Sequence, residues 1–155
     1  KHGFFKSFQK TIYMDLTQFI PRSPRNKLAG IVMIARMLDK ARAYNSKSLG
    51  EYIYPCPLDQ IILDFLSIDH KKLAYQAQKL TEKEIELWIN KMLSNRSISD
   101  KDNINKKLLG EKPNTKESIN RFNLIRDKIN PSIKNVTTWV ELIELEERQI
   151  IPKIL

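Results

Sequence analysis

Helix-start signals recur along this chain, and apolar residues at helical spacing follow each of them. Thr81 with Glu84 and Thr138 with Glu141 fit the capping box, in which each side chain satisfies a free backbone N–H of the other residue. Only four glycines occur in 155 residues, which disfavours a loop-rich or all-β fold. The pattern therefore predicts an all-α protein.

We expect a compact bundle of six to eight short helices, with room for one small β element. Ser23 suits an N-cap and Pro24 the first helical position, so a helix is expected from Ser23 to about Tyr44–Asn45. Leu49–Tyr54 is the one short extended candidate. Further helices are expected after Cys56, after Asp69, after Thr81, from Ser99 to Gly110, after Asn114 and after Thr138.

The length of the chain fits one domain, which we expect over residues 15–155. Residues 1–14 form an aromatic-basic arm with Phe4, Phe5, Phe8 and Tyr13. This arm is expected either to dock on the body or, if it does not dock, to seek a partner.

Composition narrows the functional classes. The net charge of +9 would attract polyanions, but a lysine-rich surface is usually a solvated face. No apolar stretch approaches the roughly 18 residues of a membrane span, and no secretory signal is recognisable in residues 1–10.

Cys56 is the only cysteine, so a reducing, cytoplasmic compartment is expected. With His2 and His70 as the only histidines, neither a metal site nor a cofactor is expected.

Arg22 and Arg25 flank the expected helix start at Ser23. Free backbone N–H groups make a helix N-terminus an anion site, and two arginines there could grip a phosphate or a carboxylate. Alternatively, both arginines pair with acidic groups of the same fold, such as Asp15 or Asp59.

Charged residues interrupt the apolar pattern of the expected first helix. Arg36, Asp39 and Lys40 are three and four residues apart, which places an acid and two bases on one face, and Arg42 follows. These residues fit an acid/base or anion-recognition cluster. The alternative is an ordinary ladder of helix ion pairs.

Cys56 precedes Pro57 at a helix start, where a thiol pKa is lowered. Asp59 in the first turn opposes that effect, and no histidine is placed to act as the base. A small buried thiol is the alternative. Tyr54, two residues earlier, could present its hydroxyl to a ligand.

The sequence lacks the motifs that are typical of several enzyme classes. The chain has no glycine-rich phosphate loop, no dinucleotide fingerprint, no HExxH pair and no GxSxG elbow. Whether the protein is an enzyme stays open.

Five segments run in order from Asp15 to Glu147: DLTQFIPRSPR, LAGIVMIARMLDKARA, GEYIYPCPLD, ILDFLSID and VTTWVELIELEE. Together they resemble a family of small bacterial proteins known only as a domain of unknown function. The resemblance implies a single, mainly helical, soluble domain and no particular reaction. Typical members have two glycines where this chain has Ala29-Gly30 and a Leu-Pro where it has Ile34-Ala35, so its helix is expected to be less kinked.

The sequence leaves three functional hypotheses open. The first is a site for a small anionic ligand, with enzymatic activity open. The second is a protein-interaction or homo-oligomeric module that uses the arm. The third is an RNA or ribosome-associated basic protein. The residues expected in the ligand site are Arg22, Arg25, Arg36, Asp39, Arg42, Tyr54, Cys56 and Asp59.

Overall fold

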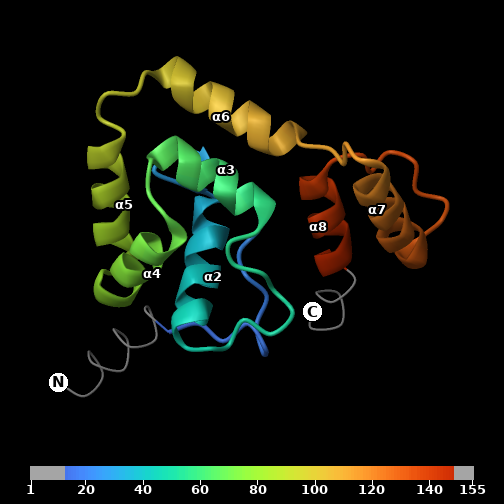
Figure 1. The fold of residues 1–155 in the computed structure, drawn as a ribbon, viewed down its shortest axis with the longest axis horizontal. Helices are drawn as coiled ribbons and strands as arrows, with labels where there is room; N and C mark the ends of the chain where they lie inside the picture. The colour runs from blue at the N-terminus through green and yellow to red at the C-terminus, as the bar shows by residue number, and fades with distance from the viewer. Residues whose placement is uncertain (1–12, 149–155) are drawn as a thin grey trace. The chain divides into compact units, whose positions relative to one another are not determined.

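Helices dominate the computed structural model, which describes residues 13–148 (Figure 1). The mainly α prediction is confirmed: the described part has seven helices and one small antiparallel sheet. No helix within residues 13–148 is long and apolar enough to cross a membrane. The elements are β1 (Lys27–Leu28), β2 (Ile31–Val32), α2 (Ile34–Asn45), α3 (Pro57–Leu66), α4 (His70–Lys79), α5 (Glu82–Met92), α6 (Ile98–Gly110), α7 (Lys116–Ile129) and α8 (Trp139–Arg148).

The chain divides into two compact units, Lys1–Ile104 and Asn105–Leu155, and each is described by itself. The expectation of one helical domain over residues 15–155 stays a prediction. Almost all of the aromatic-basic arm, residues 1–12, lies outside the described residues.

The expected helix start at Ser23 is wrong. Residues 27–32 instead form a hairpin in which Lys27 pairs with Val32 and Leu28 with Ile31. Its two-residue turn, Ala29-Gly30, has positive φ at both positions (54° and 76°), as a type I′ turn requires. This reversal prevents a continuous helix, and α2 begins only after Met33, which is also left-handed at φ 70°.

The β element was also expected in the wrong place, because Leu49–Tyr54 forms turns rather than a strand. Gly50 has a positive φ of 60°, and Tyr52 N donates to Leu49 O at 3.1 Å, which closes a turn. Pro55 and Pro57, which follow, have no N–H to offer a sheet partner. The Tyr54–Pro55 peptide is cis.

Most of the other helix starts agree with the sequence signals. α3 follows Cys56 with Pro57 first, α4 follows Asp69, and α5 follows Thr81 in a capping box with Glu84. Thr138 and Glu141 form the expected box at α8. Two starts are shifted: α6 is capped by Ser97 with Asp100 rather than beginning at Ser99, and α7 is capped by Thr115 with Ser118, one residue after the expected Asn114.

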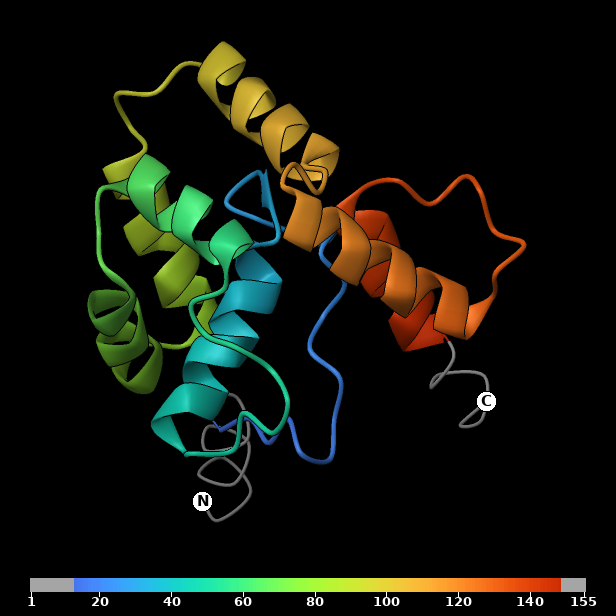
Figure 2. The same ribbon diagram turned by 45° about the vertical axis from the view of Figure 1, so that its right-hand side comes forward.

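In the first unit α2 packs against α4 and α3, and α5 packs on α4 (Figures 1 and 2). Ten of the twelve residues of α2 are buried, and α4 is its closest helical neighbour. Ile34, Met37, Leu38 and Ala41 are fully buried. A helix buried on every side must also bury whatever charges its sequence contains, and this requirement shapes the site.

The second unit contains the end of α6 and two helices, α7 and α8, that lie side by side in both views (Figures 1 and 2). Its core is the apolar cluster of Phe122, Val136 and Leu142. Trp139 packs edge-on against Phe122, with the ring centroids 5.1 Å apart.

Candidate functional site

Four charged side chains of α2 are buried. Arg36, Asp39, Lys40 and Arg42 are each no more than 5% exposed. Burying a charge costs several kcal/mol unless the group is paired and hydrogen-bonded. The partners of these four residues therefore decide what the first unit can do.

Asp39 binds Arg22 in a two-pronged contact. Arg22 Nε donates to Asp39 Oδ2 at 3.1 Å and Nη2 donates to Oδ1 at 3.0 Å. The backbone N of Arg22 also donates to Oδ2, at 2.9 Å, and Nη2 donates to Ala35 O at 3.3 Å. Side chain and backbone together thus fix the guanidinium plane against α2.

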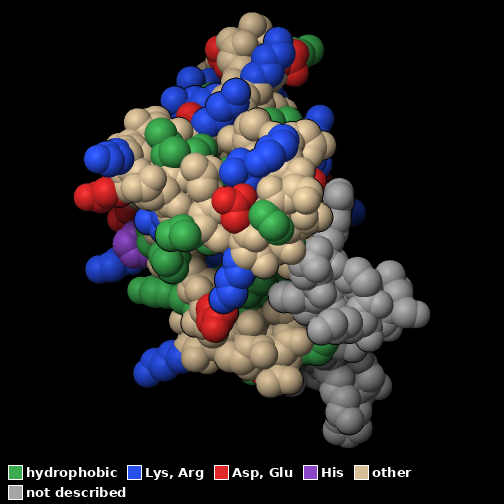
Figure 3. Space-filling model, turned by 90° about the vertical axis from the view of Figure 1, so that its right-hand side faces the viewer, with side chains coloured by type: hydrophobic (Ala, Val, Ile, Leu, Met, Phe, Trp, Pro, Cys, Tyr) green, Lys and Arg blue, Asp and Glu red, His purple; other side chains and the backbone are tan. Residues whose placement is uncertain are grey.

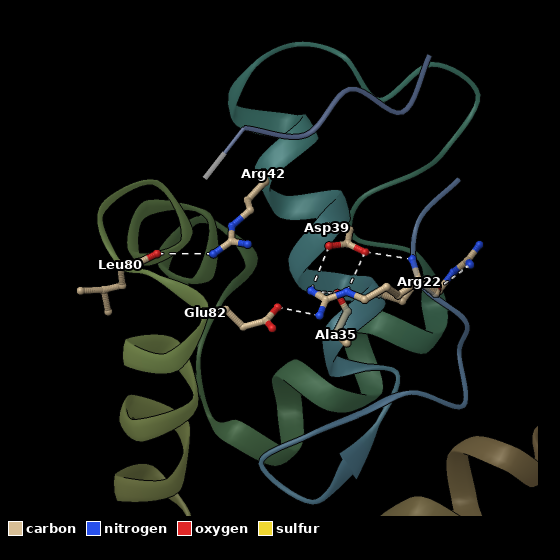
Figure 4. A network of polar contacts seen from close by, with 7 residues as sticks. Arg22, Ala35, Asp39, Arg42, Leu80 and Glu82 are labelled. Atoms are coloured by element: carbon tan, nitrogen blue, oxygen red, sulfur yellow. Dashed lines mark hydrogen bonds and ion pairs between the residues drawn. The ribbon is translucent and has the colours of Figure 1, made fainter. Parts of the chain in front are cut away.

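Arg22 has a second acidic partner on another helix. Its Nη1 lies 2.6 Å from Glu82 Oε1, at the start of α5 (Figure 4). The Arg22 side chain is 33% exposed and that of Glu82 is 40% exposed, so this contact borders solvent. Burial alone would lower the pKa of Arg22, but the hydrogen bond and the charge of Asp39, helped by Glu82, raise it.

Arg42 is held much less completely. Its Nη2 donates to Leu80 O at a long 3.4 Å (Figure 4). Its Nε is buried and has no hydrogen-bond partner among the described residues. Burial lowers the pKa of Arg42, with the charges of Glu82 and Asp39 opposing that effect. Arg42 is thus a buried cation with incomplete hydrogen bonding.

Arg36 lies one turn before Asp39 on α2 and contacts the segment that carries Arg22. Its Nη1 donates to Arg22 O at 3.1 Å, and its guanidinium lies 5.6 Å from the centroid of the Tyr52 ring. We call Arg22, Arg36, Asp39, Arg42 and Glu82 the arginine centre.

Lys40, the residue after Asp39, contacts a different group of residues. Its Nζ donates to Asp59 Oδ2 at 2.5 Å, to Cys56 Sγ at 3.3 Å and to Ile53 O at 3.2 Å. These acceptors can use all three N–H groups of the ammonium. Consecutive helix residues point about 100° apart, so Asp39 and Lys40 serve separate clusters. We call Lys40, Cys56 and Asp59 the thiol centre.

Cys56 and Asp59 are further joined as the capping box of α3. Cys56 N donates to Asp59 Oδ2 at 2.9 Å, and Asp59 N donates to Cys56 Sγ at 3.5 Å. Asp59 is fully buried, yet its Oδ1 has no hydrogen-bond partner among the described residues. Burial raises the pKa of the Cys56 thiol, and the charge of Asp59 adds to that effect, while Lys40 opposes it.

Tyr54 is placed for structure more than for ligand contact. Its hydroxyl donates to His70 O at 2.5 Å, and its ring packs against those of Tyr44 and His70 at 5.3 and 5.9 Å between centroids. Burial raises the pKa of this phenol.

The eight residues expected in the site therefore separate into groups. Arg22, Arg36, Asp39 and Arg42 come together, Cys56 and Asp59 come together, Tyr54 joins an aromatic cluster, and Arg25 lies exposed on the turn before β1. Arg22 pairs within the fold, with Asp39 and Glu82 rather than Asp15 or Asp59.

The expected set lacked Glu82 and Lys40. Lys40 was predicted in the charge cluster of the first helix, but it was not included in the ligand site. Glu82 had no such signal in the sequence, since an acid in the first turn of a helix is common.

The described residues hold no group of three or more His, Cys, Asp or Glu side chains that could bind a metal.

These features define a helical domain built around a central helix that carries paired, buried charges. The model of the family described as Domain of unknown function (DUF5069) matches residues 18–149, and the chain belongs to that family. No curated protein matches the chain.

Proposed function

We propose that the chain is a binding domain for a small carboxylate or phosphate anion, which the arginine centre receives beside Arg42. The observation that carries the proposal is the incomplete hydrogen bonding of Arg42: a side chain 4% exposed, one long hydrogen bond, and a buried Nε without a partner among the described residues. A cation in that state is unfavourable in the free protein. A bound anion would supply the missing acceptor and the missing charge.

Arg22 would give the anion its second contact. Asp39 holds the Arg22 guanidinium from one side, while Nη1 contacts Glu82, whose side chain is 40% exposed. An anion that displaces Glu82 would find the guanidinium already oriented, so little conformational entropy would be lost on binding. Two arginines that differ in exposure would thus bind one ligand, with Arg22 at the entrance and Arg42 inside.

The other two functions have less support. An interaction module would use the arm, whose residues 1–12 lie outside the described residues. RNA binding would favour a continuous basic surface, whereas basic, acidic and apolar side chains are interspersed on the face drawn in Figure 3. The small-anion site is favoured because a specific buried group requires a partner.

A thermal-shift titration tests the proposal. Inorganic phosphate and citrate are added at constant ionic strength to wild type, to Arg42→Met and to Arg121→Ala. Arg121 lies exposed on α7, so its removal lowers the net charge equally without touching the arginine centre. A ligand at about 30 times its Kd should stabilise wild type and Arg121→Ala by about 2 kcal/mol, and Arg42→Met by much less.

Equal shifts in all three proteins would show that the anions act through overall charge, and the proposal would fail. It would also fail if no anion stabilised wild type. Stabilisation by short RNA that disappears steeply with added salt would point instead to nucleic-acid binding.

A further inference from the structure

We propose that the thiol centre is a second, chemical site, in which Cys56 is the nucleophile of an acyl transfer from esters or thioesters of small carboxylic acids. An activated nucleophile is recognised by a partner side chain within hydrogen-bond reach, which a third group in turn orients. Cys56 Sγ lies 3.3 Å from Lys40 Nζ, and Lys40 lies 2.5 Å from Asp59 Oδ2. This proposal is independent of anion binding at the arginine centre.

The accessibility of the three groups suits these roles. Cys56 is partly exposed, whereas Lys40 and Asp59 are 4% and 0% exposed. Lys40 is fixed by its three acceptors and points one N–H at Sγ. Its positive charge would stabilise the thiolate formed in the reaction.

The unpartnered oxygen of Asp59 marks the place of the base. A fully buried carboxylate oxygen without a hydrogen bond is rare in proteins, and Asp59 Oδ1 is such an atom within the described residues. The other oxygen of the same carboxylate accepts from both Lys40 Nζ and Cys56 N, which places the group beside the residue that carries the thiol. Burial raises the pKa of the Cys56 thiol, so a base that takes the thiol proton would assist the attack.

The proposed reaction has two steps, acylation of Cys56 and hydrolysis of the thioester. In the first, Sγ bonds to the carbonyl carbon, the thiol proton passes to Asp59, and the ester C–O bond breaks as the leaving alcohol takes that proton. In the second, Asp59 removes a proton from water, the hydroxyl adds to the thioester carbon, and the C–S bond breaks. The sulfur leaves as a thiolate facing Lys40 and regains the proton, so the free acid and the thiol remain.

The first turn of α3 could stabilise the negative oxygen formed in each step. Leu58 N–H belongs to that first turn, two residues after Cys56, where an α-helix offers the backbone N–H groups no intrahelical acceptor. A free backbone N–H beside a nucleophile, at the positive end of a helix, is the usual donor to such an oxyanion.

The test uses the full chain with p-nitrophenyl acetate. Because Cys56 is the only cysteine, any thioester in the protein lies on Cys56, and neutral hydroxylamine distinguishes it from acetylated lysine. Wild type should release more than one equivalent of p-nitrophenol, and its thioester should hydrolyse about 100-fold faster than that of an unstructured peptide with the sequence of residues 54–60.

Four variants assign the roles. Cys56→Ser should lose the turnover, Lys40→Gln should slow acylation, and Asp59→Asn should lengthen the life of the thioester. Lys91→Gln, which removes an exposed lysine, should behave as wild type. Turnover that persists in Cys56→Ser would overturn the proposal. So would a wild-type thioester as long-lived as that of the peptide, and this comparison decides the matter even if a variant fails to fold.

Discussion

The helices α2 and α7 are similar in length and both carry several charges, but their environments are opposite. Ten of the twelve residues of α2 are buried, and four of those ten are charged. Of the fourteen residues of α7 only Phe122 is buried, and its charged residues are partly or fully exposed. Charged residues of the same types therefore have a large desolvation cost in α2 and a small one in α7.

The difference shows which charges call for a functional explanation. A lysine on α7 keeps its hydration, so it contributes little to stability and needs no partner. A lysine or arginine inside α2 has lost its water and must be compensated by specific acceptors. Lys40 is compensated, whereas Arg42 is not, and this contrast led to the proposed anion site.

The largest effect is expected for Lys40→Met, which leaves the fully buried Asp59 without its cation. Breaking a buried ion pair from one side costs about 3–5 kcal/mol. Urea unfolding would measure the loss. Lys128→Met on the exposed surface of α7 should change stability by less than about 0.5 kcal/mol. Equal losses in the two variants would remove the distinction between the helices.

Phe122→Ala tests the apolar side of the comparison. Phe122 is 2% exposed and packs on Trp139, so its truncation should cost the second unit about 3 kcal/mol. Hydrogen exchange should accelerate in α7 and α8 while the amides of α2 stay protected. Loss of protection in α2 would contradict the description of two compact units.

Asp39→Asn should have a smaller effect than Lys40→Met. Arg22 loses its charged acceptor but is one-third exposed and retains Glu82, so the expected cost is about 2 kcal/mol. Chemical unfolding at low and high salt would measure it. A cost above that of Lys40→Met would mean that burial does not rank these pairs.

The smallest effect concerns the pKa of Cys56. Burial and the charge of Asp59 raise that pKa in the folded state, so folding favours the protonated thiol. This contribution is present below the pKa of the unfolded thiol and declines as pH rises through the folded pKa. The rate of alkylation by iodoacetamide should therefore rise at higher pH in the native protein than in urea. A native midpoint at or below the urea value would show that Lys40 dominates instead.

Local signals in the sequence predicted much of the fold. Asp69, Thr81 and Thr138 cap their helices through contacts within three residues, so their roles are visible in the sequence. The start at Ser23-Pro24 failed because the Ala29-Gly30 turn reverses the chain a few residues later. That turn requires a positive φ at Ala29, and a sequence pattern does not predict a positive φ at an alanine.

The site was only partly predictable for a different reason. The charges within Arg36–Arg42 were visible as exceptions to an apolar pattern. Their partners were not, since Asp39 pairs with Arg22 seventeen residues earlier and Lys40 with Asp59 nineteen residues later. Packing of the first unit creates these pairs, and it places the neighbours Asp39 and Lys40 in separate centres.

We infer that Arg42 is kept buried for binding rather than for stability. The decisive measurement is the unfolding free energy of Arg42→Met in the absence of ligand. Replacing a poorly compensated buried charge with an apolar side chain of similar length is often neutral or stabilising. Arg42→Met is expected to be as stable as wild type, or more stable by about 1 kcal/mol. A loss of several kcal/mol would show that Arg42 is a structural residue and would rule out that it is kept for binding.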